Sequence, residues 1–149
     1  MSITKPELPQ VDSPAFGAPD SVPFMRELGT ELLRADAGEA ELALSLHDWH
    51  LNSWGVAHGG VVMALLDVAM ARAGQSLAGE APGTVTVEMK TSFFAPARGR
   101  LRAVGRVLHR STTMAYCEAE LFSADGTLSA KAMGTFKFLR RLDAAPRIR

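Results

Sequence analysis

The segment spanning residues 61–71 constrains the fold of this chain more than any other part of the sequence. Every residue in it is apolar except Asp67, and two glycines stand directly before it. A run of this kind indicates a helix that begins at Gly59 or Gly60 and ends near Leu77. Because a helix that is apolar on all sides has to be buried, the sequence predicts that other elements pack around one long central helix.

Asp67 is the first candidate for a functional residue. An unpaired carboxylate inside a buried helix is costly, and such a group is usually kept for chemistry. The alternative is a structural carboxylate that pairs with Arg72 or with a backbone donor. Arg72 lies five residues further on and points to another side of the helix, which favours a functional role for Asp67. The other residues of its helix face are small, so a ligand or a second chain could approach: Gly60, Ala64, Ala71 and Gly74.

Six further segments alternate apolar and polar residues, as half-buried strands do. They span residues 30–36, 39–47, 84–95, 100–110, 114–123 and 128–139. Breaks at residues 96–99, 109–112 and 125–126 carry hairpin signals, so the last four segments are expected to form an antiparallel meander. In the third segment we expect one inner face, made of Val85, Val87, Met89, Thr91 and Phe93.

Small residues occupy many inward positions of the last three predicted strands, as at Ala103, Gly105, Ala119 and Ala132. They leave room for a helix to lie close against a curved sheet. One sheet wrapped around one apolar helix is the simplest way to bury both. The expected fold is therefore α+β, with a curved antiparallel sheet around a long central helix.

The composition indicates one domain with an extension at each end. The chain has 149 residues, of which 47% are hydrophobic, and this is enough for a single core. Five of the eight prolines fall within residues 1–23, which predicts an extended arm there. A short helical turn at residues 24–29 is expected to lead into a domain covering residues 24–140, and residues 141–149 are expected to form a basic tail.

Charge and cysteine content argue against several classes of protein. The chain has 16 basic and 16 acidic residues, so no overall field attracts nucleic acid or an anionic membrane. No uncharged apolar run reaches ~18 residues, and the N-terminus does not look like a secretion signal, so neither a membrane span nor export is expected. The single Cys117 excludes an intramolecular disulfide and a multi-cysteine metal site, and it favours a cytoplasmic location.

Gly59 and Gly60 stand where backbone amides have a chemical use. The first N–H groups of a helix have no partner inside it and lie at the positive end of its dipole. Without side chains nearby, they can approach a carbonyl oxygen and stabilise the oxyanion that forms when the carbonyl is attacked. The alternative is that the glycines only form a tight turn. Asp67, about two helical turns further on, favours the catalytic interpretation.

Two residues of the preceding loop have both a chemical and a structural interpretation. Asn52 can orient a water or polarise a carbonyl, although loop asparagines often form turns instead. His58 can act as an acid or base, and it can equally brace the loop by hydrogen bonds, which we favour. Together with His47 and His50 it could suggest a metal, but the spacing matches no zinc signature, so no metal site is expected.

Basic residues along segment 100–110 are interpreted as a solvated outer face, partly neutralised by Glu118 and Glu120 across a hairpin. This face is expected to hold Arg100, Arg102, Arg106 and Arg110. Arg110, Ser111 and Thr112 come at a hairpin end, which makes them the better candidates to bind a phosphate.

The chain resembles the hotdog-fold acyl-CoA thioesterases, most closely the PaaI-like branch with its phenylacetate-pathway and 4-hydroxybenzoyl-CoA-type enzymes. The resemblance lies in Asn-Ser-Trp-Gly-Val-Ala-His-Gly-Gly at residues 52–60, followed by Leu-Leu-Asp at 65–67. Residues 93–97 and 134–136 also look like strand endings of that family. The match covers residues 24–139.

The resemblance implies a function, a set of roles and an assembly. The acid at the Asp67 position would act as general base or nucleophile on a thioester, the Gly59 amide would polarise its carbonyl, and the Asn52 side chain would position water or substrate. Active sites would lie between two subunits of a homodimer or homotetramer. Coenzyme A, as part of the substrate and not a cofactor, would lie along the interface with its phosphates near basic surface residues.

The chain departs from the family pattern at one position, and two other functions are possible for this fold. Ala71 stands where some relatives place a hydroxyl residue that assists the attacking water, which leaves the detailed mechanism open. A non-catalytic acyl-CoA binding module is the second hypothesis, and an acyl-thioester hydratase or dehydratase is the third, although no Gly-Asp-x-Asn-Pro-x-His string occurs. For the acyl group, an aromatic or medium-length chain is expected, with Gly60, Met63 and Phe93 among the substrate contacts.

Overall fold

The computed structural model describes residues 22–79, 81 and 83–139, so the predicted arm at 1–21 and the tail at 140–149 lie outside the described residues. Within that part the element order is α1 (Pro23–Leu28), β1 (Glu31–Asp36), β2 (Glu39–Ser45), the 3₁₀ turn η1 (Asp48–His50), α2 (Gly59–Gln75), β3 (Thr84–Phe93), β4 (Arg100–Arg110), β5 (Met114–Phe122) and β6 (Leu128–Phe138). The strand and helix boundaries lie within a few residues of those expected. Pro23, expected at the end of the arm, is instead the first residue of α1, where its fixed φ suits a helix start.

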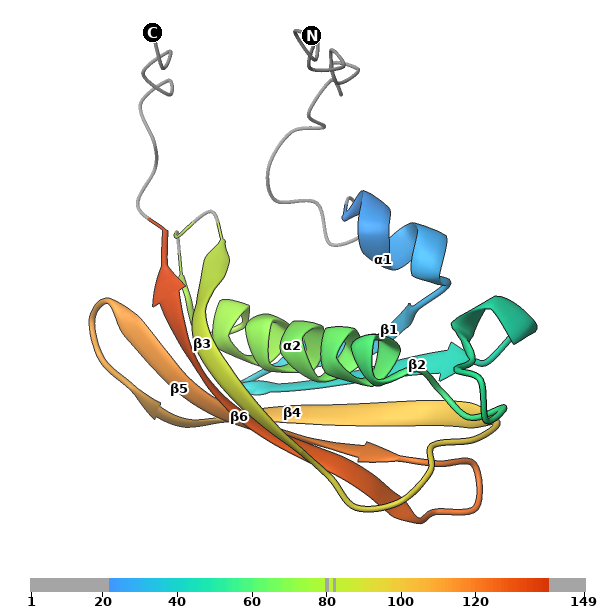
Figure 1. The fold of residues 1–149 in the computed structure, drawn as a ribbon. Helices are drawn as coiled ribbons and strands as arrows, with labels where there is room; N and C mark the ends of the chain where they lie inside the picture. Colours follow the sequence, from blue (N-terminus) through green and yellow to red (C-terminus); the bar gives the residue numbers. More distant parts are fainter. Residues whose placement is uncertain (1–21, 80, 82, 140–149) are drawn as a thin grey trace, which may run out of the picture.

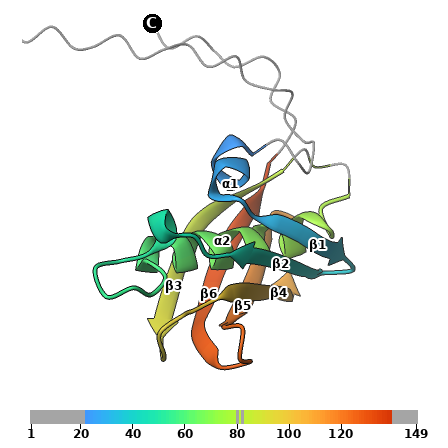
Figure 2. The same ribbon diagram turned by 90° about the vertical axis from the view of Figure 1, so that its right-hand side faces the viewer.

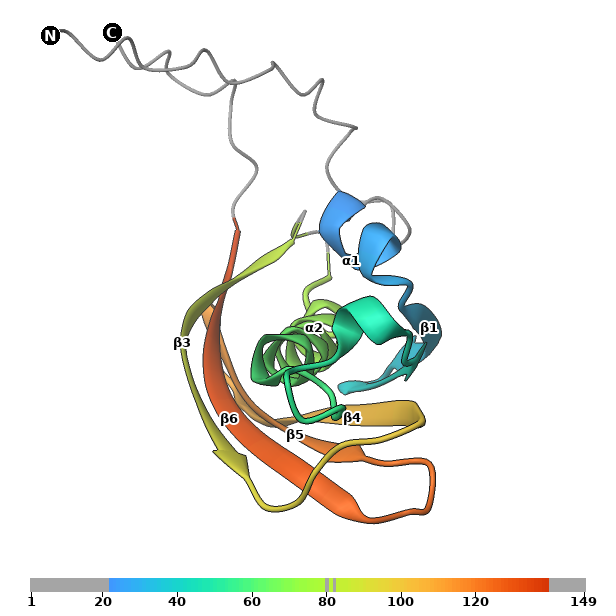
Figure 3. The same cartoon turned by 45° about the vertical axis from the view of Figure 1, so that its right-hand side comes forward.

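The six described strands form one antiparallel sheet in the order β1-β2-β4-β5-β6-β3, and the sheet curves around α2 (Figures 1 and 3). This confirms the α+β architecture and its central helix. Figure 2 shows β3 and β1 at the two opposite edges of the sheet. The hairpin predicted at residues 96–99 is wrong. Because β2 and β5 occupy both edges of β4, β3 cannot pair with β4 and instead pairs with β6.

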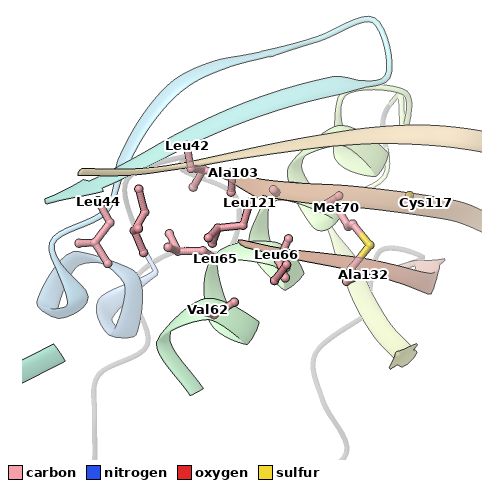
Figure 4. Close-up of a cluster of buried hydrophobic side chains, with 14 of the residues drawn as sticks. Leu42, Leu44, Val62, Leu65, Leu66, Met70, Ala103, Cys117, Leu121 and Ala132 are labelled. Carbon is pink, nitrogen blue, oxygen red and sulfur yellow. The ribbon is translucent and has the colours of Figure 1, made fainter. Parts of the chain in front are cut away.

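The core lies between the concave face of the sheet and one side of α2 (Figure 4). Leu65, Leu66 and Met70 point from α2 toward strand residues such as Leu121 and are fully buried. The predicted small inward residues are buried as expected. At Gly105 the approach is closest, since an added Cβ would lie 2.4 Å from the backbone carbonyl of Ala69.

The expectation that α2 is buried on every side is wrong. A strip along the helix faces away from the sheet, with Gly60 exposed and Met63 41% exposed. Ala64, Asp67 and Ala71 on the same strip are half-buried. The reason is geometric: a single curved sheet covers one side of a helix, and within the described residues the edge strand β3 reaches the strip only through Thr84 and Thr86.

A β-bulge in β3 corrects the predicted inner face of that strand. The pairing with β6 shifts register between Thr86 and Glu88, so Thr84 and Thr86 lie opposite the inward residues of β6 while Val85 and Val87 point outward. Val85 and Val87 are 42% and 54% exposed. Beyond the bulge, Met89 is on the inner face as expected. An extra residue reverses the alternation, because strand side chains repeat every two residues.

Candidate active site

Asp67 lies midway along α2 on the uncovered strip and is half-buried. Its Oδ1 accepts a hydrogen bond of 2.7 Å from Oγ1 of Thr86 on β3. The sequence placed the carboxylate on a helix face of small residues that a ligand could approach, and in the structure it is accessible from the open side of the helix. Since Thr86 occupies one oxygen, the other is available to a reacting group.

Thr86 is the site residue that sequence reasoning missed. Simple alternation assigned Thr86 to the outer face and Val85 and Val87 to the inner one. Threonine suits either face of a sheet, and the sequence holds no local signal for the bulge that turns it inward. Its neighbour Thr84 also faces α2, where Oγ1 donates to the carbonyl oxygen of Ala71 at 3.2 Å. A hydroxyl therefore does stand near the carboxylate, but it comes from the sheet rather than from helix position 71.

The Gly59 amide is open at the start of α2. His58 is the N-cap residue, and its Nδ1 accepts the N–H of Gly60 at 2.9 Å. The Gly60 amide, expected to contact substrate, is thus already used within the chain. The N–H of Gly59 makes no hydrogen bond within the described part of the chain. The arrangement leaves one helix-terminal donor at the positive end of the dipole.

His58 has the bracing position that we favoured. Because its Nδ1 is the acceptor for Gly60, the neutral imidazole carries its proton on Nε2. The backbone carbonyl of His58 accepts the N–H groups of Val61 and Val62 at 2.9 and 3.2 Å. Both the ring and the main chain of this residue therefore stabilise the first turn of α2.

An apolar wall stands beside the Gly59 amide. A Cβ added at Gly59 would lie 3.6 Å from Cζ of Phe93, so the ring packs directly against the helix start. Met63 lies one turn further along the strip, and Phe93 is 54% exposed. The Phe93 ring and the Gly59 amide therefore lie side by side, and Met63 stands one turn further along the same helix.

Asn52 takes the turn-forming role that was its alternative. Its Oδ1 accepts the backbone N–H groups of Trp54 at 2.9 Å and Val56 at 3.4 Å. The loop is closed further by the N–H of Asn52, which donates to the Val56 carbonyl at 2.8 Å. Trp54, at the tip, is 85% exposed. The Asn52 side chain therefore braces the loop through its oxygen, and its amide Nδ2 is the group left for a ligand.

Arg110, Ser111 and Thr112 lie at the opposite end of the sheet from Gly59. Arg110 stacks 5.3 Å from the ring centroid of Phe138, and Phe138 pairs with Thr84 at the first residue of β3. Phe93, which contacts the Gly59 position, is the last residue of β3. Nine residues of strand separate the two ends, or about 30 Å, so one chain does not bring the two groups together.

Three of the four arginines of β4 form ion pairs on its outer face, but only Glu118 is a partner that was expected. Glu120 pairs with Lys131 instead, and Arg102 pairs with Glu41. Arg100 pairs with Glu31 at 2.8 Å, and Arg106 pairs with the buried Glu118. The pKa of the Glu118 carboxyl is lowered, chiefly by its hydrogen bond from Lys131. Arg110 was wrongly assigned to this face. A register shift between Val107 and His109 places it opposite the buried Ala115, on the inner side.

Ser111 has a structural role in the β4–β5 turn. Its Oγ accepts the N–H of Met114 at 3.0 Å and that of Thr113 at 3.3 Å.

Among the described residues, no group of three or more potential ligands could hold a metal ion. In the same part of the chain, no helix is long and apolar enough to cross a membrane.

The chain is similar in sequence to a known protein family and to individual known proteins. The model of the thioesterase superfamily matches residues 55–130, which is half of the chain. A protein of Saccharolobus solfataricus named as an esterase is 31% identical over 76% of this chain and 81% of its own length. The medium/long-chain acyl-CoA thioesterase YigI of Salmonella typhimurium is 28% identical over 77% of this chain and 84% of its own length.

Solved structures agree with the sequence matches. A mutant of the phenylacetic acid degradation protein PaaI from Thermus thermophilus is 32% identical, with a TM-score of 0.71 over 78% of this chain and 99% of that chain. The family match covers the Gly59 helix start, Asp67 and Thr86 together. The chain therefore belongs to the thioesterase superfamily and is a thioester hydrolase.

Proposed function

We propose that this chain hydrolyses an acyl-CoA to the carboxylate and free coenzyme A. The observation that carries the proposal is that one helix, α2, holds both an accessible carboxylate, Asp67, and an unoccupied helix-terminal donor, the Gly59 N–H. The first can generate or act as a nucleophile, and the second can receive the negative charge that develops on a thioester oxygen.

In this mechanism the thioester oxygen accepts the Gly59 N–H, which makes the carbonyl carbon more electrophilic. The Asp67 carboxylate then removes a proton from a water while that water attacks the carbonyl carbon. The tetrahedral intermediate collapses, the C–S bond breaks, and the CoA thiolate leaves. Alternatively, Asp67 attacks the carbon itself and forms a mixed anhydride that water hydrolyses. In both routes the Thr86 hydroxyl holds one carboxylate oxygen and so orients the other.

The site requires two copies of the chain. Asp67 follows Gly59 by eight residues, so the two lie about 12 Å apart along the helix axis, too far for both to reach one thioester. A second copy, antiparallel to the first, would bring the Gly59 of one chain to the Asp67 of the other. Of the two sheet edges, that of β3 is the one proposed for the pairing, because Thr86 of β3 contacts Asp67 and Phe93 of β3 contacts the Gly59 position.

The same antiparallel pairing gives Arg110, Ser111 and Thr112 a role. If two β3 strands lie side by side in opposite directions, the Thr84 end of one meets the Phe93 end of the other. Arg110, beside Phe138 at the Thr84 end, then approaches the reaction centre of the second copy and can meet the phosphates of coenzyme A. A homodimer is the smallest assembly that satisfies this geometry, and a homotetramer of two such dimers fits it equally.

The acyl group would lie against Phe93 and Met63, beside the Gly59 amide. An exposed aromatic ring and a flexible thioether favour an aromatic or medium-length acyl chain. The names of two relatives point the same way, since one is a medium/long-chain acyl-CoA thioesterase and another a phenylacetic acid degradation protein. Asn52 Nδ2 is proposed to orient water or substrate. The cytoplasmic location expected from the single cysteine stays a prediction.

A panel of aromatic and aliphatic acyl-CoAs tests the proposal, with released CoA followed by a thiol reagent. Asp67→Asn keeps the size of the side chain and an oxygen acceptor for Thr86, and it removes the base. We expect its kcat to fall by at least ~1000-fold with the fold intact. Tight binding without thiol release by the native chain would indicate a binding module, and loss or gain of water across a C=C bond without thiol release would indicate a hydratase.

A further inference from the structure

His50 is a fully buried polar side chain that the proposed reaction does not use. Its exposed fraction is 0%, and both ring nitrogens are engaged. Nδ1 accepts the backbone N–H of His47 at 2.9 Å, and Nε2 lies 2.8 Å from the carbonyl oxygen of Leu28. The Trp49 ring covers it, with the two ring centroids 3.6 Å apart. A buried polar group with this many partners is held in one orientation.

The two hydrogen bonds determine which nitrogen carries the proton. The Leu28 carbonyl can only accept, so Nε2 donates to it, and Nδ1 is the acceptor for His47. The bond to His47 is local to η1. The bond to Leu28 spans 22 positions and ties η1 to the last residue of α1, whose Met25 and Leu28 are part of the core.

The main chain of His50 continues this connection toward the proposed oxyanion donor. Its carbonyl oxygen accepts the N–H of His58 at 2.8 Å. The His58 ring in turn accepts the Gly60 N–H at 2.9 Å. Gly59 lies between these two anchored residues. The direction of its N–H is therefore determined by where His50 holds His58.

We propose that His50 is a positioning residue for the reaction and that its bond to Leu28 aims the Gly59 N–H at the thioester oxygen. The inference rests on the proposed function. An oxyanion donor is effective only when it lies about 2.7–3.1 Å from the developing charge, and displacement by a fraction of an ångström weakens it. Loosening His50 should consequently reduce kcat, while KM, which reports ground-state binding, changes little.

Two substitutions separate the two bonds of the imidazole. In His50→Asn, Oδ1 can replace Nδ1 as the acceptor for His47, but the side chain is too short to reach Leu28. In His50→Gln, the amide Nε2 can take the place of the ring Nε2 and restore the bond to Leu28. If the bond to Leu28 positions the amide, His50→Gln retains at least fivefold more kcat than His50→Asn.

A double-mutant cycle with Gly59→Pro distinguishes positioning from general loss of stability. Proline has no N–H, so in that background there is no amide left to aim. We expect His50→Asn to lower kcat by about tenfold in the native chain and by less than twofold in Gly59→Pro, with KM within threefold throughout. A merely structural defect would lower kcat by the same factor in both backgrounds.

The outcomes are distinguishable from failure of the proposed function itself. If Gly59→Pro alone leaves kcat unchanged, the oxyanion assignment fails. If Gly59→Pro lowers kcat but His50→Asn has an equal effect in both backgrounds, or none, the positioning inference is overturned. If His50→Asn does not fold, as judged by thermal unfolding, the kcat of His50→Gln relative to the native chain is the deciding measurement. Retained kcat supports the inference, and a tenfold loss in kcat contradicts it.

Discussion

Replacing Gly59 by proline removes a single backbone N–H, the proposed oxyanion donor, from a position that suits proline. Gly59 is the first residue of α2, where proline is over-represented because its missing N–H has no helical partner there. The preceding residue must be extended, and His58 already is, with φ −59° and ψ 138°. The backbone can therefore accept Gly59→Pro without rearrangement.

The expected loss is large and confined to the chemical step. Removing one oxyanion donor costs about 10²–10³ in kcat, or about 2.7–4 kcal/mol of transition-state stabilisation. The change in stability should stay within about 1 kcal/mol, which corresponds to a few degrees in Tm for a domain of this size. Gly59→Ala is the matched control. It keeps the N–H, and its Cβ makes an ordinary contact with Phe93 at 3.6 Å.

The assay measures kcat and KM by thiol release for the native chain and both variants, with Tm from thermal unfolding. We expect Gly59→Ala to lose less than fivefold in kcat and Gly59→Pro to lose at least a hundredfold. The reasoning is refuted if the folded proline variant stays within fivefold of the alanine variant. It is also refuted if KM rises while kcat is unchanged, because that pattern would mean that the ring excludes substrate rather than removing a donor.

Three further predictions concern the Thr86 hydroxyl, the proposed pairing of two chains, and the buried Cys117. Thr86→Val removes the hydroxyl that orients Asp67 while keeping the side-chain shape, and it should lower kcat about tenfold, since a hydrogen bond to a charged group is worth about 1.5–3 kcal/mol; an unchanged rate would remove Thr86 from the mechanism. Asp67→Asn and Gly59→Pro chains, each inactive alone, should recover about a quarter of native activity when refolded together, because half of random pairs are mixed and each mixed pair has one intact site; no recovery would place each site within one chain. Burial raises the pKa of the Cys117 thiol to about 11, so a disulfide reagent at pH 8 should label it only as fast as the chain unfolds, and immediate labelling would contradict the described packing.

Several features of the fold could be predicted because they depend on local side-chain patterns. The apolar run after Gly59 and Gly60 predicts a central helix, and the observed α2 begins at Gly59. The alternation along residues 100–110 predicts β4 with its observed boundaries. Small inward residues such as Gly105 anticipate the close contact with α2. In each case the period of the side chains and the gain from burial act within a single element.

The features that the sequence predicted wrongly all depend on residues that are far apart in the chain. The break at residues 96–99 is a turn signal, but which strand pairs with β3 depends on the edges left free by β2, β5 and β6. Thr86 and Arg110 lie on faces opposite to those predicted, because one bulge in β3 and one in β4 reverse the alternation. Such bulges allow a sheet to curve around a helix, and no local sequence pattern identifies them reliably.

By itself, the sequence determined the central helix, the six strands, and the identity of Asp67 and Gly59 as a carboxylate and an amide on one helix. Local periodicity and the chemistry of single residues are sufficient for that. Only the tertiary structure decided that Thr86 reaches Asp67, that the helix keeps one open strip, and that buried His50 connects α1 to the start of α2. These depend on hydrogen bonds and packing between residues separated by 19 or more positions, which form only when the sheet closes around the helix.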